Sequence, residues 1–226
     1  DHVQRLIDEI GAMGAAGQRQ VRSLTLIGGR DKAGRAEGIR LTLKAGEIVC
    51  IVGPTGSGKS RLLADIECLA QGDTPTGRQI LVDARIPDED WRYALDRKLV
   101  AQLSQNMNFV VDLAVRDFIT MHALCRQVAE PDAMAEKVIA CANELTGEKF
   151  APEVSVTQLS GGQTRALMIA DAALLSASPV VLIDEIENAG VDRQRALKLL
   201  VSGDKIVLIS THDPLLALRG DRRQIG

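Results

Sequence analysis

Residues 48–60, IVCIVGPTGSGKS, decide the fold of this 226-residue chain. The first five residues form a continuous apolar run, which is typical of a buried strand in a parallel sheet. Residues 53–60 satisfy the pattern GxxxxGK[ST], and residues 62–69 then carry leucine and isoleucine at helical spacing. The stretch therefore predicts a strand, a glycine-rich loop and a helix, in that order.

The loop between this strand and this helix has the composition of a phosphate site. Glycines let backbone N–H groups turn inward at a helix N-terminus, where an anion is stabilised. The pattern predicts that Lys59 reaches the β and γ phosphates of a nucleotide and that the Ser60 hydroxyl ligates Mg2+. A chance glycine-rich turn is the alternative, and the flanking strand and helix count against it. The residues expected to contact ATP here are Gly53, Pro54, Thr55, Gly56, Ser57, Gly58, Lys59, Ser60 and Arg61.

The bulk composition excludes several classes of protein. With 46% hydrophobic and 25% charged residues, the chain can bury a core as one large domain. A net charge of −3 and only five aromatic residues argue against a nucleic-acid partner. No apolar run approaches the roughly 20 residues of a membrane-spanning helix, so any membrane role must go through a partner. Without a signal peptide pattern at the start, the expected location is cytoplasmic, or peripheral on the inner face of the cell membrane through that partner.

The remaining patterns place the loop within an α/β fold. Apolar periodicity predicts an N-terminal helix and join over residues 1–20, followed by one domain over residues 21–226. Within that domain we expect a small antiparallel sheet from residues 21–43 and 80–82, and a helical subdomain over about residues 106–158. The sequence then predicts helices over 162–175 and 193–201, alternating with strands over 180–184 and 205–210. Such alternation is typical of a mainly parallel sheet covered by helices, with ligands at the carboxyl ends of its strands.

Residues 180–185, VVLIDE, form an apolar strand that ends in two acids. This pattern places Asp184 at the carboxyl edge of the sheet, where it would hold Mg2+ through a coordinated water. Glu185 would act as the general base that polarises the attacking water. The alternative is an acidic turn that merely follows a buried strand, and we would favour it if the phosphate loop were absent.

Residues 159–163, LSGGQ, precede a predicted helix and would form a second anion site at a helix terminus. Ser160 alone would be interpreted as an N-cap. LSGGQ about twenty residues before the apolar strand with two acids resembles the signature of ATP-binding-cassette ATPases, and the resemblance covers nearly the whole chain from Val21 onward. It implies a P-loop NTPase core and a dimer in which the signature of one subunit contacts the γ phosphate held by the other. The signature residues expected to act in this way are Ser160, Gly161, Gly162 and Gln163.

The resemblance also assigns three residues outside these motifs. Gln105 matches a glutamine that touches Mg2+ and links the core to the helical subdomain. His212, after the last apolar strand, matches a histidine that contacts the γ phosphate and orients Glu185 and the water; a satisfied structural histidine is the alternative. Asp192 matches a residue at the dimer interface. The expected catalytic residues are therefore Lys59, Glu185 and His212.

Two stretches depart from the family pattern. The loop after Glu185, residues 186–192, is one residue longer than usual, which makes the geometry between subunits less certain. The family also stacks an aromatic side chain on the adenine, and residues 27–30, IGGR, carry none. Arg30 could stack its guanidinium plane instead, which leads to the hypothesis of relaxed discrimination between ATP and GTP.

The expected function is ATP binding and hydrolysis by the nucleotide-binding subunit of a membrane transporter, driven by ATP-dependent dimerisation. Its expected partners are a second ATPase subunit, either a second copy or a paralogue, and a separate membrane-spanning subunit. The alternative is a soluble ATPase that acts on a cytosolic protein, nucleic acid or cofactor-assembly partner. A nucleotide-binding regulator that barely hydrolyses ATP is a third hypothesis, against which the intact Lys59, Asp184, Glu185 and His212 argue.

Overall fold

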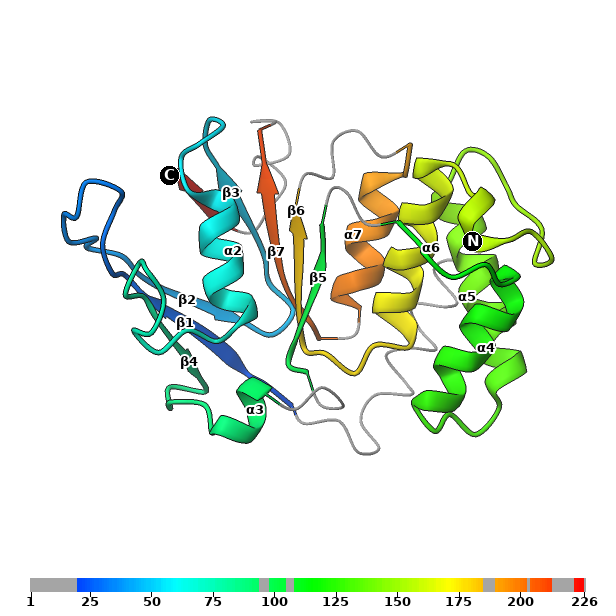
Figure 1. Cartoon of the computed structure of the whole chain (residues 1–226), viewed down its shortest axis with the longest axis horizontal. Coiled ribbons are helices and arrows are strands. Elements are labelled where there is room, and N and C mark those ends of the chain that lie inside the picture. The colour runs from blue at the N-terminus through cyan, green and yellow to red at the C-terminus, as the bar shows by residue number, and fades with distance from the viewer. Residues whose placement is uncertain are drawn as a thin grey trace. The chain divides into compact units, whose positions relative to one another are not determined.

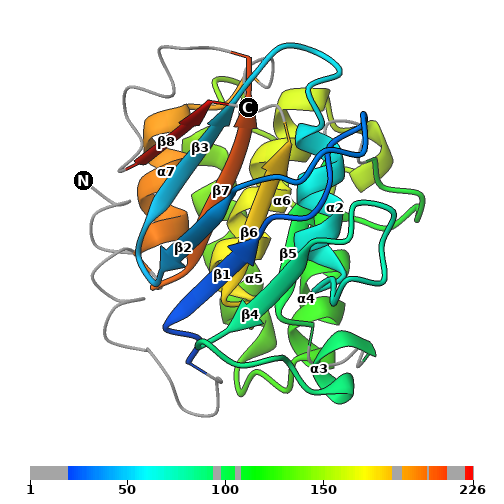
Figure 2. The ribbon, with the colours of Figure 1, turned by 90° about the vertical axis from the view of Figure 1, so that its left-hand side faces the viewer.

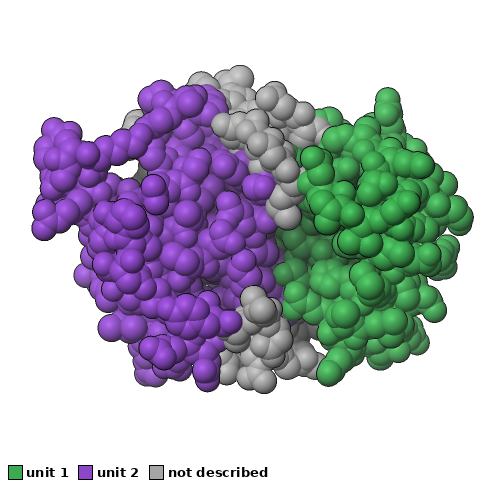
Figure 3. Space-filling model, viewed as in Figure 1, with its two compact units in different colours: residues 1–14, 105–176, 188–203 green, residues 15–104, 177–187, 204–226 purple. Residues whose placement is uncertain are grey.

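The computed structural model describes residues 20–93, 98–104, 108–184, 190–202, 204–212 and 222–225, and Figure 1 shows its ribbon. These residues form two compact units, which Figure 3 colours separately. The sheet unit contains the described residues of 15–104, 177–187 and 204–226, and the helical unit those of 105–176 and 188–203. Each unit is described by itself below. The helix expected at residues 1–20 lies outside the described residues, apart from residue 20 itself.

A five-stranded parallel sheet is the centre of the sheet unit. Its strand order is β5-β6-β7-β3-β8, which confirms the predicted parallel sheet. The central strands β6 and β7 are almost entirely buried, as their continuous apolar sequences predict. The five strands are β3 (Ile48–Val52), β5 (Val100–Leu103), β6 (Val180–Asp184), β7 (Ile206–Thr211) and β8 (Arg222–Ile225).

A second, three-stranded sheet in the same unit is antiparallel, as predicted. Strand β1 (Ser23–Ile27) lies between β2 (Arg40–Lys44) and β4 (Gln79–Val82). Leu26 of β1 pairs with Leu41 of β2 on one side and with Ile80 of β4 on the other. All three side chains are buried, so this register turns one face of the sheet toward the core.

One apolar core holds the sheet unit together. Helix α2 (Lys59–Glu67) contacts β5, β6 and β7 of the parallel sheet and β4 of the antiparallel sheet. Buried side chains of both sheets and of α2 form a single cluster, to which Leu24, Val49 and Leu63 each contribute with no exposed surface. Figure 2 shows the three-stranded sheet in front of the five-stranded sheet. A short helix, α3 (Glu89–Tyr93), completes the unit. The shared core fixes α2, and with it the phosphate loop, on the sheet.

The helical unit consists of four helices and one short turn of 3-10 helix. Along the chain, each helix contacts the next, and α5 also contacts α7. Pro131 starts α5, where its missing N–H costs nothing. The elements are α4 (Val115–Cys125), α5 (Pro131–Leu145), η1 (Val156–Gln158), α6 (Gly161–Leu174) and α7 (Arg193–Val201). Helices α6 and α7 belong to this unit, which therefore extends beyond the expected helical subdomain of about residues 106–158.

The element boundaries match the sequence to within a few residues. Strand β6 and helix α7 have the predicted bounds, whereas α6 begins one residue early, at Gly161, and β7 begins one residue late, at Ile206. Helix α4 ends at Cys125, and Gln127 just after it takes a left-handed conformation with φ 57°. Strands β5 and β8 and helix α3 have no counterpart among the elements predicted from the sequence.

Candidate nucleotide site

The phosphate loop follows β3 and leads directly into α2. Gly56 and Gly58 have φ of 84° and 103°, which a residue with a side chain rarely adopts. Among the described residues, no side chain caps the N-terminus of α2. The first N–H groups of α2 therefore face the loop, and no capping side chain accepts from them. A helix N-terminus in this state can bind phosphate.

Lys59 is buried, with 8% of its surface exposed, and its ammonium points back into the loop. Its Nζ donates to the carbonyl oxygens of Gly53, at 2.6 Å, and Pro54, at 3.0 Å. These bonds offset the cost of burying a charge. Ser60, the next residue, is exposed on the first turn of α2.

His212 lies at the same loop, although it comes from the far end of the sequence. Because β3 and β7 pair in parallel, with Val52 opposite Thr211, His212 leaves the sheet beside the start of the loop. Its Nδ1 is 3.0 Å from the Gly53 carbonyl oxygen and 3.5 Å from Lys59 Nζ. A carbonyl oxygen only accepts, so a hydrogen bond to Gly53 requires the proton on Nδ1.

Asp184 ends β6 at the same edge of the sheet. It is half-buried and stands opposite Ser210 of β7 in the strand register. Because His212 directly follows β7, this register places Asp184 and His212 at the ends of neighbouring strands. Glu185 and Gln105, which the sequence assigns to catalysis and to metal binding, lie outside the described residues, as do residues 186–189 of the lengthened loop.

The helix that follows the signature begins with a complete capping box. Ser160 Oγ accepts from the Gln163 backbone N–H at 3.3 Å, and Gln163 Oε1 accepts from the Ser160 N–H at 2.8 Å. The Gln163 amide also donates to the Glu148 carbonyl at 3.2 Å. Ser160 is exposed, and accepting one hydrogen bond leaves its hydroxyl proton free to donate elsewhere. Gly161 and Gly162 occupy the first turn of α6 without side chains that would cover it.

Asp192 caps the next helix, α7. Its Oδ1 accepts from the backbone N–H groups of Gln194, at 3.0 Å, and Arg195, at 3.1 Å. Its own N–H donates to the Leu145 carbonyl at 2.7 Å, which ties α7 to the end of α5. Asp192 is exposed at this position.

The structure thus gathers the expected residues into two groups. Lys59, Ser60, Asp184 and His212 belong to the sheet unit with the phosphate loop, whereas residues 160–163 and Asp192 belong to the helical unit. The oxygen donors of Ser60 and Asp184 suit Mg2+, which prefers one or two protein ligands with water and substrate phosphate. Among the residues that the structure describes, no three His, Cys, Asp or Glu side chains are grouped so that they could hold a metal ion.

The hairpin between β1 and β2 carries a contact that sequence reasoning missed. Arg30, the expected replacement for the aromatic residue, is exposed, and its backbone N–H is bonded to the Thr76 carbonyl. Two residues later, Lys32 Nζ donates to the Gly56 carbonyl of the phosphate loop at 2.5 Å. A lysine in a polar turn gives no signal of this contact in the sequence.

A family model and two relatives in sequence agree on the class of protein to which this chain is similar. A family model described as ABC transporter matches residues 36–188. An uncharacterized ABC transporter ATP-binding protein of Methanocaldococcus jannaschii is 53% identical over 205 residues, which cover 90% of this chain and 78% of that protein. A macrolide export ATP-binding/permease protein of Chromobacterium violaceum is 31% identical over 201 residues, which cover 86% of this chain and 30% of that protein.

Among solved structures, an ATP-binding cassette of Methanocaldococcus jannaschii has the same fold. It is a dimer in a post-hydrolysis state with bound ADP and phosphate. Its TM-score is 0.65 at 27% identity, and the match covers 89% of this chain and 93% of the other.

Proposed function

The chain belongs to the ABC transporter family. On that premise we propose that it is the nucleotide-binding subunit of a membrane transporter and that it pairs with a second ATPase subunit when both bind ATP. It is an ATP-binding ATPase with the P-loop fold of that family.

The proposal rests on one observation, which is that three helix N-termini differ in whether a side chain caps them. No side chain caps α2 among the described residues, whereas Ser160 caps α6 and Asp192 caps α7. The uncapped N-terminus opens on the phosphate loop and suits a bound phosphate. The signature terminus keeps an exposed hydroxyl with a free proton, which suits a phosphate brought by another subunit.

Within one subunit we assign the chemistry to residues around the phosphate loop. Lys59 and the N–H groups of residues 53–61 bind the β and γ phosphates, and Ser60, Asp184 and Gln105 hold Mg2+. The metal neutralises charge on the phosphate oxygens during transfer. Glu185 orients the attacking water and accepts its proton. His212 donates from one ring nitrogen to Gly53, so its other nitrogen can face the γ phosphate.

Across the dimer we assign the signature to the nucleotide of the other subunit. The N-terminus of α6, with Ser160 and Gly162, would complete that site by offering a hydroxyl and backbone N–H groups. Asp192 would face the second subunit from the start of α7. Hydrolysis then needs both subunits, because each supplies half of each site.

The proposal of a membrane-spanning partner draws on exposed apolar side chains of the helical unit. Val110 is 93% exposed, and Met121 and Leu124 on α4 are 45% and 58% exposed. Met121 and Leu124 are three residues apart on α4 and so share one side of that helix, and contiguous exposed apolar side chains often mark protein interfaces. In the part of the chain that the structure describes, no helix has the length and apolar content needed to cross a bilayer. A relative described as a macrolide export ATP-binding/permease protein supports a membrane-spanning partner for this domain.

The dimer is tested with the Glu185→Gln variant. Slowed hydrolysis should trap two copies on ATP and Mg2+, so light scattering during gel filtration should report a dimer with ATP and a monomer with ADP. Lys59→Ala/Glu185→Gln is the matched control, which should remain monomeric because it binds ATP poorly. A Glu185→Gln protein that stays monomeric in ATP and Mg2+ would contradict the proposal.

The membrane partner needs a separate experiment. Glu185→Gln protein captured from its native cells with ATP and Mg2+ should bring down a chain with several membrane spans. Replacement of Met121 and Leu124 by serine should abolish that capture while leaving ATP-dependent dimerisation intact. Capture of soluble partners alone would assign the chain to the soluble class of ABC ATPases instead.

A further inference from the structure

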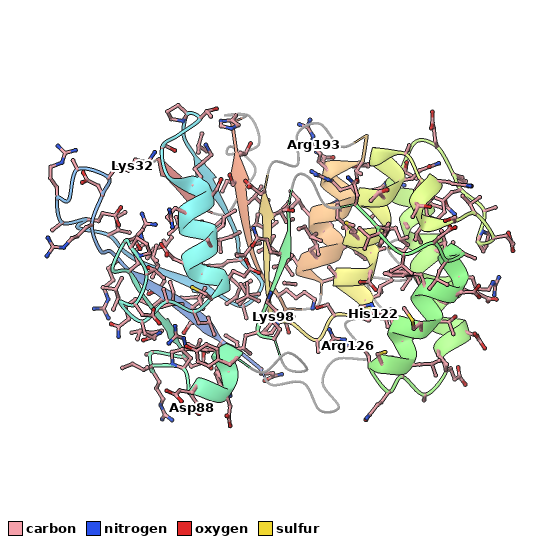
Figure 4. The ribbon with its side chains drawn as sticks, in the orientation of Figure 1. Lys32, Asp88, Lys98, His122, Arg126 and Arg193 are labelled. Carbon is pink, nitrogen blue, oxygen red and sulfur yellow. The ribbon has the colours of Figure 1, made fainter. Side chains whose placement is uncertain are left out.

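We propose that Lys32 is a second lysine ligand of the nucleotide phosphates, supplied by the β1–β2 hairpin and placed opposite Lys59 on the phosphate loop. This inference rests on the proposed nucleotide site. Figure 4 labels Lys32, whose side chain points from the hairpin toward the loop between β3 and α2. Its ammonium donates to the Gly56 carbonyl at 2.5 Å. Lys59 donates to the carbonyls of Gly53 and Pro54 in the same loop.

The hairpin that carries Lys32 is held in shape by Asp31. The Asp31 carboxylate accepts from the backbone N–H groups of Ala33 and Arg35 and from the Arg35 side chain, each at 2.8 Å. Hydrogen bonds from the Arg35 backbone lower the pKa of Asp31, so the carboxylate stays charged and keeps this turn closed. Further bonds join Asp31 with Arg35 and Glu37 with Gly29 along the backbone. Lys32 therefore extends from a preformed turn.

A buried ion-pair network anchors the base of the hairpin to α2. Arg78, 8% exposed, donates to Glu37 of the hairpin at 2.9 and 2.7 Å and to Asp65 of α2 at 3.0 Å. Gly29 makes a close approach at the same place, since a Cβ there would stand 2.0 Å from the Thr76 carbonyl oxygen. Because α2 also starts with Lys59, both lysines are positioned by one connected piece of structure.

Electrostatics favours transfer of this ammonium from the carbonyl to a phosphate. Hydrogen bonds between two charged groups are about twice as strong as those with a neutral partner. The Lys32 ammonium lies 2.5 Å from a backbone atom of the phosphate loop, the segment that a β or γ phosphate would contact. This gain in binding energy comes from the phosphates and not from the base. Residues 27–30 contain no aromatic ring that could stack on the base.

A phosphate contact from Lys32 affects which nucleotides bind. If Lys32 and Lys59 supply most of the binding free energy, the affinity for a nucleotide depends on its number of phosphates and only weakly on its base. ATP and GTP should then bind with similar affinity, and ATP should bind far more tightly than AMP.

The test measures equilibrium affinity for ATP, ADP and AMP by calorimetry or by competition with a fluorescent nucleotide. Lys32→Met should weaken ATP binding about five- to tenfold, the range expected for an exposed charge-assisted hydrogen bond. The loss for AMP should be smaller, and Lys32→Arg should recover part of the ATP affinity. Lys44→Met, which removes another exposed lysine from the same sheet unit, is the matched control and should bind ATP like the parent. Added salt should weaken ATP binding less in Lys32→Met than in the parent.

Each alternative result has a definite meaning. Unchanged ATP affinity in Lys32→Met, an equal loss in Lys44→Met, or an equal loss for AMP and ATP would overturn the role of Lys32. Lys59→Ala tests the underlying site separately. If that variant keeps full ATP affinity, the proposed function fails; if it loses affinity while Lys32→Met does not, only the inference about Lys32 fails.

Discussion

Lys59 and His212 stand 153 residues apart in the chain, yet both reach the carbonyl oxygen of Gly53. Lys59 Nζ lies 2.6 Å from this oxygen and His212 Nδ1 lies 3.0 Å from it. The parallel pairing of β3 with β7 produces this convergence, because both strands end at the same edge of the sheet. The lysine proposed to bind phosphate and the histidine proposed to contact it thus share one backbone acceptor.

His212 and Lys59 should differ in what their removal changes. His212→Ala should lower kcat by at least about a hundredfold while leaving ATP affinity within a few fold, since the imidazole acts in hydrolysis. Lys59→Ala should weaken ATP binding itself. Steady-state ATPase assays and a direct binding measurement on both variants separate the two effects. Equal loss of ATP affinity in both variants would contradict the division of roles.

Ser160 is expected to have two separable roles, as an N-cap and as a phosphate ligand. Ser160→Ala should cost about 1 kcal/mol of unfolding free energy, because α6 loses its cap. Ser160→Asp keeps a good cap and should preserve stability, yet its negative charge should repel the γ phosphate and abolish ATPase activity. Ser160→Thr should retain both properties. Urea unfolding and ATPase assays on the three variants check this, and an active Ser160→Asp protein would argue against a phosphate at this helix.

Asp192 should stabilise α7 independently of any dimer. Its carboxylate accepts from two backbone N–H groups, so Asp192→Ala should destabilise the monomer by about 1 kcal/mol. Asp192→Asn should restore the stability, since Asn caps equally well. If Asp192→Asn still lowers ATP-dependent dimerisation, the charge acts at the interface. Denaturation of the monomer and sedimentation with ATP provide the two readouts.

The contribution of Glu37 to the free energy of unfolding should change with pH in the acidic range. Hydrogen bonds from Arg78 lower the pKa of Glu37, even though burial opposes this shift. A carboxyl group with a lowered pKa stabilises the fold fully above its ordinary pKa of about 4.3, and this contribution is lost as the pH falls through the lowered value. The difference in unfolding free energy between the parent and Glu37→Gln should therefore shrink below about pH 4. A difference that is the same at pH 7 and at pH 3 would show that the ion pair does not contribute in this way.

The sequence was sufficient to predict the strands and helices around the phosphate loop. Strand β3, the loop and α2 follow one another as predicted, because an apolar run, a glycine pattern and helical spacing are all local features. Strand β6 and helix α7 have their predicted bounds for the same reason. Strand β5 was missed because only its end residues, Val100 and Leu103, are buried, so it shows neither alternation nor a long apolar run.

Other parts of the structure depend on contacts between distant residues. Arg78 reaches Glu37 across 41 residues and Asp65 across 13, and no spacing rule connects these positions. Strand β8, with the sequence RRQI, is polar and is recognised by its pairing with β3 rather than by its composition. The roles of Gln105 and Glu185 remain predictions, because both residues lie outside the described residues.

The central claim is that each hydrolysis site is completed by a second subunit, and mixing two inactive variants tests it most directly. Lys59→Ala lacks a working phosphate loop, and Ser160→Asp lacks a working signature. A mixed dimer contains one site with an intact loop from the Ser160→Asp copy and an intact signature from the Lys59→Ala copy. We expect the mixture to hydrolyse ATP although neither protein does so alone. No activity in the mixture, from two folded variants shown to form mixed dimers, would contradict it.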